Sequence, residues 1–177
     1  MDFRSDVVLR GIAWDKTIKS LSSIFSSRPK YNIYLLSLSI GIMYDKRIEK
    51  LDESEESETY NVPRNVLNTQ SSDGRLDFMY QSAILTSQTV DYDEDTRLEM
   101  AFGDTTESSK KIAFLTEFAN FGVTKLAEKI GTSNLESMEN IKNFLVSTLE
   151  GRNFDIDALN VDDLMDDWEP DFSVRPN

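Results

Sequence analysis

Apolar side chains recur every three or four positions along most of the chain, which is the spacing of one face of a helix. The first stripe predicts a helix over 14–26. Its apolar members are Trp14, Ile18, Leu21, Ile24 and Phe25. The second stripe is almost uninterrupted between Pro29 and Asp45, so it predicts the most buried helix of the fold. Gly41 lies inside this helix, where glycine costs about 1 kcal/mol relative to alanine, and we interpret it as the place of a close helix crossing.

The later part of the chain carries four more helical patterns. They predict helices over 75–88, over a shorter stretch that ends at Phe102, over 107–130, and from Ser133 to Gly151. We expect the last of these helices to direct its apolar side chains inward. They are Met138, Ile141, Phe144, Leu145 and Leu149.

Two helix starts carry the sequence of a capping box, in which a polar N-cap side chain is followed three residues later by Glu. Asp104 with Glu107 predicts such a box for the longest helix, and Ser133 with Glu136 predicts one for the last helix. Between the early and late helices, Pro63 interrupts alternating apolar residues, so we read 60–67 as an extended or turn segment.

These patterns predict an all-α fold, a compact bundle of five to six helices with an acidic, partly disordered C-terminal extension. We assign residues 1–151 to one helical domain. Within it, 51–58 reads LDESEESE, with five acidic and no basic residues, and predicts a solvated acidic loop. We assign 152–177 to an acidic tail, since 153–177 holds eight acidic residues and only Arg175 as a base.

Composition narrows the chemistry that such a fold can perform. The 177 residues include no cysteine and no histidine, which excludes thiol nucleophiles and cysteine-ligated zinc and removes the commonest general base. The 32 acidic and 19 basic residues give a formal net charge of −13, which disfavours a uniformly basic nucleic-acid surface. No phosphate-loop or nucleophile-elbow sequence occurs. We therefore predict a protein that is not an enzyme and needs no cofactor.

The targeting signals of an exported or membrane protein are missing from this sequence. The first ten residues lack the apolar core of a signal peptide. The most apolar run, 31–44, is shorter than the roughly 20 residues that cross a bilayer. We therefore predict a cytoplasmic location and no membrane contact.

Carboxylates at alternate positions are the feature that comes closest to a metal motif. Asp91, Asp93 and Asp95 resemble the start of an EF-hand calcium loop. Such a loop needs glycine at its sixth position and glutamate at its twelfth, where this chain has Thr96 and Phe102. We interpret the run as a solvated helix start and predict no metal site.

A carboxylate-metal nuclease or hydrolase would require a convergent acidic pair in a pocket. The candidate pairs are Asp77 with Glu99 and Asp77 with Glu117, and nothing in their spacing selects either. We predict no catalytic residues.

Basic residues gather in the first 50 positions, where they exceed the acidic ones by four. Lys46, Arg47 and Lys50 are the candidates for nucleic-acid contact, because a local basic patch binds phosphate even on an acidic protein. The alternative is that these side chains complement the negative C-terminal end of the preceding helix. Any role of nucleic acid is expected to be indirect.

The acidic tail carries apolar side chains between its charges. Leu164, Met165, Trp168 and Phe172 are the predicted partner-binding residues, since large apolar side chains supply most of the binding energy at interfaces. The alternative is that the tail packs on its own domain, and the sequence leaves both open.

Three segments carry a resemblance to a known family. They are YNIYLLSLSIGIMYDKR (31–47), NVPRNVL (61–67) and FLTEFANFGVTKL (114–126). In this order they resemble the small bacterial proteins associated with dnd DNA-phosphorothioation systems. The most recognisable family string is an aromatic residue followed by Ala-Asn-Gly-Gly, and here Phe121 replaces its first glycine.

The resemblance implies a non-catalytic accessory subunit of a bacterial antiphage defence complex, which works like a DNA-modification and restriction system. Its implied partner is a larger ATPase or nuclease encoded in the same operon. The resemblance assigns no chemical role to 118–122, and we interpret Asn120 as a polar cap or helix-contact residue. The alternative function is an acidic DNA mimic or regulator that inhibits a DNA-binding enzyme.

Overall fold

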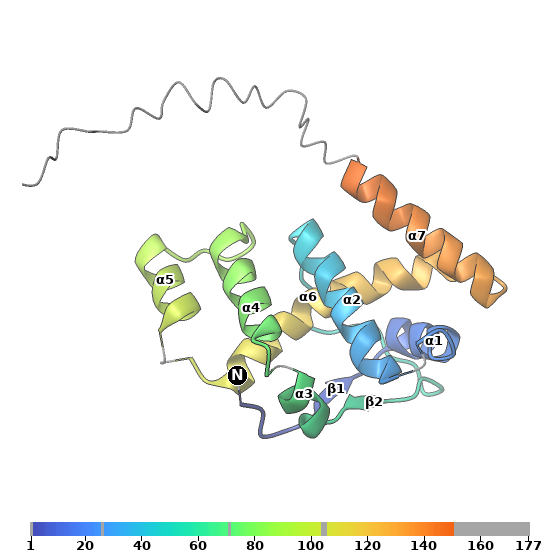
Figure 1. The fold of residues 1–177 in the computed structure, drawn as a ribbon, viewed down its shortest axis with the longest axis horizontal. Coiled ribbons are helices and arrows are strands. Elements are labelled where there is room, and N and C mark those ends of the chain that lie inside the picture. The colour runs from blue at the N-terminus through green and yellow to red at the C-terminus, as the bar shows by residue number, and fades with distance from the viewer. Residues whose placement is uncertain (1, 26, 71, 104–105, 151–177) are drawn as a thin grey trace, which may run out of the picture. The chain divides into compact units, whose positions relative to one another are not determined.

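A computed structural model describes residues 2–25, 27–70, 72–103 and 106–150 (Figure 1). These residues form seven helices and two short strands. The chain is therefore mostly helical, as predicted, but the all-α assignment with five to six helices is corrected by a small sheet and an additional helix. The predicted tail, 152–177, lies outside the described residues.

The elements follow one another in the order β1, α1, α2, β2 and α3 to α7. The strands are β1 (Val7–Leu9) and β2 (Tyr60–Val62), and the helices are α1 (Ile12–Leu21), α2 (Pro29–Tyr44), α3 (Arg64–Gln70), α4 (Arg75–Thr86), α5 (Glu94–Phe102), α6 (Ser108–Lys129) and α7 (Asn134–Glu150). The predicted bounds of α2, α4 and α6 agree with the observed bounds within two residues. The helix predicted over 14–26 instead begins two residues earlier and ends at Leu21.

The two strands pair antiparallel, with Val7 opposite Val62 and Leu9 opposite Tyr60. Both strands have three residues, which is too short for an alternating pattern to stand out from the helical periodicity around it. The segment read as extended or turn is thus a strand up to Val62, and α3 begins directly after Pro63. Proline suits this position because it cannot continue the ladder of a strand but is tolerated where a helix begins.

Helices α2 and α6 cross at the centre of the fold (Figure 1) and make the most extensive contact between elements. Two glycines form the crossing point. A Cβ on Gly41 would lie 2.9 Å from the Cα of Phe118, and a Cβ on Gly122 would lie 3.0 Å from the Cα of Ser37. Each glycine therefore admits the backbone of the opposite helix, which confirms the close crossing predicted from Gly41 and adds Gly122 as its counterpart.

The core surrounds this crossing. Trp14 of α1 stacks on Tyr34 of α2 with ring centroids 6.4 Å apart, and Phe118 of α6 meets Phe114 edge to face at 5.3 Å. The largest fully buried side chains are Trp14, Tyr34, Tyr80, Phe118, Leu9, Leu21, Ile33, Leu38, Ile40, Leu67, Leu76 and Ile84. All of them except Ile40 belong to one core, which joins nearly every element before α7.

Asn120 is a buried polar residue that joins three parts of this core. Its Oδ1 accepts a hydrogen bond from Nε1 of Trp14 at 2.9 Å, and its Nδ2 donates to the carbonyls of Ile48 at 3.0 Å and Glu49 at 3.3 Å. The amide thus satisfies a buried indole and the backbone that follows α2. The interpretation of Asn120 as a helix-contact residue is confirmed.

The two predicted capping boxes have different outcomes. Ser133 accepts a hydrogen bond from the backbone of Glu136, whose carboxylate accepts from the backbone of Thr132, so the box before α7 is confirmed. Glu107 is the N-cap of α6 but makes no side-chain cap, and Asp104 lies outside the described residues. Glu107 therefore starts α6 through its backbone carbonyl, which accepts from Lys110 and Lys111.

Contacts divide the chain into two units, Met1–Ile141 and Lys142–Asn177. The elements from β1 to α6, together with the first half of α7, belong to the first unit. Among the described residues, no helix combines the length and apolar character that a membrane span requires.

Candidate functional site

The acidic run Asp91, Asp93 and Asp95 lies at the start of α5. Asp93 is the N-cap of this helix, and its carboxylate accepts a hydrogen bond from the backbone N–H of Thr96 at 2.7 Å. The hydrogen bonds from Thr96 lower the pKa of Asp93. The described residues contain no group of three or more acidic side chains placed to hold a metal ion. The run therefore acts as a helix start, as predicted.

Arg47 is directed into the protein rather than toward a ligand. Its guanidinium donates to Glu117 at 2.9 Å and to both the hydroxyl and the carbonyl of Thr89. It also lies 5.1 Å from the ring centroid of Phe114. Three N–H groups of Arg47 thus hold the loop after α2 against α6 and the loop after α4. Glu117, a candidate for a carboxylate pair, is the acidic partner in this contact.

Lys46 and Lys50 have exposed side chains, and nucleic-acid contact stays a prediction for them. Lys50 is 81% exposed and its Nζ is 3.7 Å from Glu53. Lys46 lies over the ring of Phe121 at 5.9 Å, and Lys125 lies 5.8 Å from the same ring. The ring of Phe121 is half-buried and also packs against Tyr44 at 5.8 Å, and Lys125 pairs with Glu128 at 2.7 Å. The sequence pattern did not place Lys125 beside Lys46, because Lys125 lies on α6, far from Lys46 along the chain.

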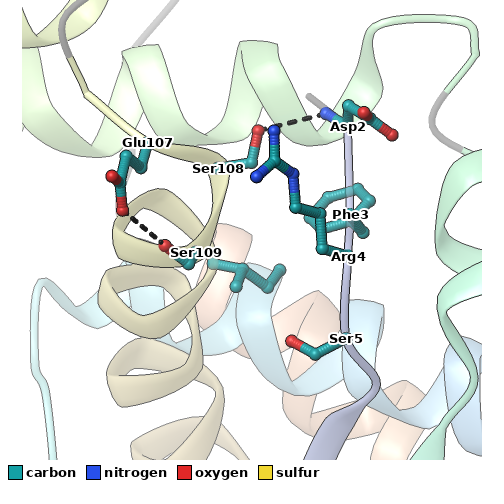
Figure 2. A pocket seen from close by; sticks show the side chains of 8 residues that line it. Asp2, Phe3, Arg4, Ser5, Glu107, Ser108 and Ser109 are labelled. Carbon is teal, nitrogen blue, oxygen red and sulfur yellow. Dashed lines mark hydrogen bonds between the residues drawn. The ribbon is translucent and has the colours of Figure 1, made fainter.

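A cavity of about 270 Å³ lies between the N-terminal segment and the start of α6 (Figure 2). Asp2 donates its backbone N–H to Ser108 at 3.1 Å, and Ser109 donates its hydroxyl to Glu107 at 3.2 Å. The lining includes two carboxylates, from Asp2 and Glu107, against the single guanidinium of Arg4. This balance of charge opposes the attraction of the helix N-terminus for an anion.

Three groups with shifted pKa values form a structural contact between α1 and β2. Burial raises the pKa of Asp15, but hydrogen bonds from Lys19 and from Tyr60 (2.8 Å) outweigh it, so the net pKa is lowered. Hydrogen bonds to Asp15 and Glu58 raise the pKa of Lys19 to about 12. Burial, followed by the bond to Asp15, raises the pKa of Tyr60 to about 12. All three shifts move away from neutral pH, so these groups are unsuited to general acid–base catalysis there.

Arg97 holds the turn between α4 and α5. Its side chain donates to the carbonyls of Ile84, Ser87, Val90 and Tyr92 at 2.7 to 3.0 Å. These four backbone carbonyls thus accept their hydrogen bonds from one guanidinium instead of from backbone N–H groups of a helix. This residue is structural, and the sequence pattern gave no signal for it.

Helix α7 presents apolar side chains to solvent at its start. Leu135 is 73% exposed and Met138 is 50% exposed. The prediction that Met138 points inward is therefore wrong, whereas Ile141 packs against the core as predicted. A helix gains most of its stability in proteins from burying its apolar face, so exposed members of that face indicate an unfilled contact.

The four predicted partner-binding residues, Leu164, Met165, Trp168 and Phe172, lie outside the described residues. Their role in partner binding therefore stays a prediction. The chain matches no protein-family model, no curated protein and no solved structure. A functional proposal therefore depends on the surfaces of this chain and on the sequence resemblance.

Proposed function

We propose that the protein is a non-catalytic interaction subunit of a bacterial antiphage defence complex, bound to a larger ATPase or nuclease of the same operon. The observation that carries this proposal is the exposure of Leu135 and Met138 at the start of α7. These side chains are three positions apart, so they lie on the same side of the helix. Burying a side chain of this size contributes about 1.5 to 3 kcal/mol, which a partner can supply.

The chemistry of the partner follows from the charge of this part of the chain. Residues 134–177 contain eleven acidic and three basic residues, a net charge of −8. The polar positions of α7 include Glu136 and Glu139, close in sequence to its exposed apolar residues. A groove with an apolar floor and a basic rim would therefore complement α7. The anchors predicted further along, from Leu164 to Phe172, likewise combine large apolar side chains with neighbouring acidic residues.

Co-purification tests this proposal. Tagged full-length protein is expressed in a host that carries the neighbouring genes, and the bound proteins are identified after a salt wash. We expect the wild-type chain to retain an ATPase or nuclease. The double variant Leu135→Ser/Met138→Ser should lose most of it, because its binding surface no longer buries two apolar side chains.

The matched control is Phe78→Ser on α4, which removes a side chain of similar exposure, 68%, from a different helix. This control should retain the partner as the wild type does. Trp168→Ala/Phe172→Ala then tests the predicted anchors of the tail. If the wild-type chain retains neither class of enzyme, or if the α7 variant retains as much as the control, the proposal fails. A chain without a partner would favour the acidic regulator instead.

A further inference from the structure

A small apolar recess lies beside the N-terminal end of α2, where the chain passes from β2 into α3. Its volume is about 140 Å³. The residues that line it are Arg28, Pro29, Lys30, Tyr31, Val62, Pro63 and Val66. The prolines and valines make the floor apolar, and the exposed side chains of Arg28 and Lys30 lie at its edge. A recess of this kind suits one aliphatic or aromatic side chain.

The electrostatic surroundings of the recess differ from those of the protein as a whole. The two segments that line it, 27–34 and 60–67, contain three basic residues, Arg28, Lys30 and Arg64, and no acidic residue. The first turn of α2 has no acidic residue and its N-cap makes no side-chain hydrogen bond. The positive end of the helix dipole therefore adds to the basic side chains. Within a chain of net charge −13, this place attracts negative charge.

Acidic groups from neighbouring elements are already engaged with other cations or donors. Asp73 pairs with Arg75 at 3.1 Å, and Asp15 pairs with Lys19 at 3.0 Å. Lys30 is held over the ring of Tyr60, with its Nζ 5.3 Å from the centroid. Asp6 accepts a hydrogen bond from the backbone N–H of Arg64 at 2.9 Å. The charge of Lys30 thus stays next to the recess.

Tyr31 forms part of the wall of the recess. This lining residue is 3% exposed, and its hydroxyl has no hydrogen-bond partner among the described residues. Burial raises the pKa of this hydroxyl, so it remains a hydrogen-bond donor. The recess itself is lined almost entirely by apolar atoms, so its part in binding is to bury an apolar side chain.

We propose that this recess binds an acidic peptide segment of a partner protein, with one aliphatic or aromatic side chain in the recess and carboxylates next to Arg28, Lys30 and the N-terminus of α2. A peptide fits better than nucleic acid, because the cationic patch is short and its centre is a hole for an apolar group. A nucleic-acid backbone requires a longer basic track. This site is separate from Leu135 and Met138, and the proposal does not depend on the proposed function.

Fluorescence anisotropy with the full-length protein tests this site. The probe is a short fluorescein-labelled peptide in which pairs of aspartates flank a leucine and a tryptophan. We expect saturable binding that Lys30→Glu weakens by about ten-fold, since reversing a charge beside a carboxylate removes an attraction and adds a repulsion. Lys110→Glu is the matched control, because it makes the same charge change at an exposed position of α6 outside the recess. This control should bind as the wild type does.

Two altered peptides separate the two parts of the recognition. Replacing the aspartates by asparagine, or the leucine and tryptophan by alanine, should each weaken binding by about ten-fold or more. Absence of saturable binding, or equal binding by Lys30→Glu and Lys110→Glu, overturns the proposal. Displacement of the probe by single-stranded DNA but not by unlabelled peptide would assign the recess to nucleic acid and overturn it too. Tighter binding by Trp168→Ala/Phe172→Ala protein would mean that the protein's own acidic segment is the occupant, which refutes the partner.

Discussion

Replacing Gly122 with alanine tests whether the crossing of α2 and α6 holds the fold together. In the native geometry the added Cβ would lie 2.6 Å from the carbonyl carbon of Ser37 and nearer still to its oxygen. This separation is about 0.8 Å shorter than an ordinary contact of 3.4 Å. The atoms it meets are backbone atoms inside a helix, which cannot rotate away. The two helices must therefore move apart.

Two opposing effects set the size of the change. Alanine favours a helix over glycine by about 1 kcal/mol, which would stabilise the variant. Overpacking of a tight core costs about 1 to 3 kcal/mol, and the upper end applies here because the obstacle is a helix backbone. Separation of the helices also loosens the packing of Leu38 and Phe118, both at most 1% exposed. We expect Gly122→Ala to lower the free energy of unfolding by about 2 kcal/mol.

The assay is urea unfolding followed by far-ultraviolet circular dichroism, which reports the helices directly. Ser39→Ala is the control, because it introduces alanine at an exposed position of α2 two residues from Gly41. It should change the free energy of unfolding by no more than about 0.5 kcal/mol. An unchanged or increased stability of Gly122→Ala would show that helix propensity prevails and that the crossing is not tight, which refutes the reasoning.

The double variant Gly41→Ala/Gly122→Ala gives a further check. Both added methyl groups push apart the same two helices, so the second substitution meets a gap that the first has already opened. The combined loss of stability should be smaller than the sum of the two single losses. Strict additivity would mean that the two contacts relax independently, against the reciprocal geometry of the crossing.

Three other predictions concern polar contacts of the fold. Asn120→Leu should lower the free energy of unfolding by about 2 kcal/mol in urea titrations, because it leaves the buried indole N–H of Trp14 without an acceptor. Arg97→Ala should accelerate hydrogen exchange in α5 while α2 keeps its protection, since the turn before α5 loses four hydrogen bonds. Tyr60 has a pKa raised from 10.0 to about 12, so its contribution to stability is present below pH 10 and is lost as the pH rises toward 12. Tyr60→Phe should therefore lose less free energy of unfolding than the wild type between pH 10 and 12, as measured by urea unfolding at each pH. The same pH dependence in both proteins would contradict the raised pKa of Tyr60.

The helices were predictable because their signals are local. The apolar run after Pro29 predicted α2, the cap sequence at Ser133 predicted the start of α7, and a glycine in the middle of α2 predicted a close crossing. Each signal depends on residues within a few positions of one another, where backbone propensity and side-chain periodicity act directly. Both bounds of α1, predicted over 14–26 but observed at Ile12–Leu21, and the strand at Val7–Leu9 were missed because short elements carry too few periods.

The sequence by itself thus determined that the chain is mostly helical, that it lacks histidine and cysteine chemistry, and that its acidic charge is concentrated toward the end. Only the tertiary structure decided the functions of individual side chains. Arg47 meets Glu117 across 70 positions, Trp14 meets Asn120 across 106, and the recess joins the start of α2 to Val62. Such pairs follow from how helices pack, and helical periodicity states which face is apolar but not which other element covers it.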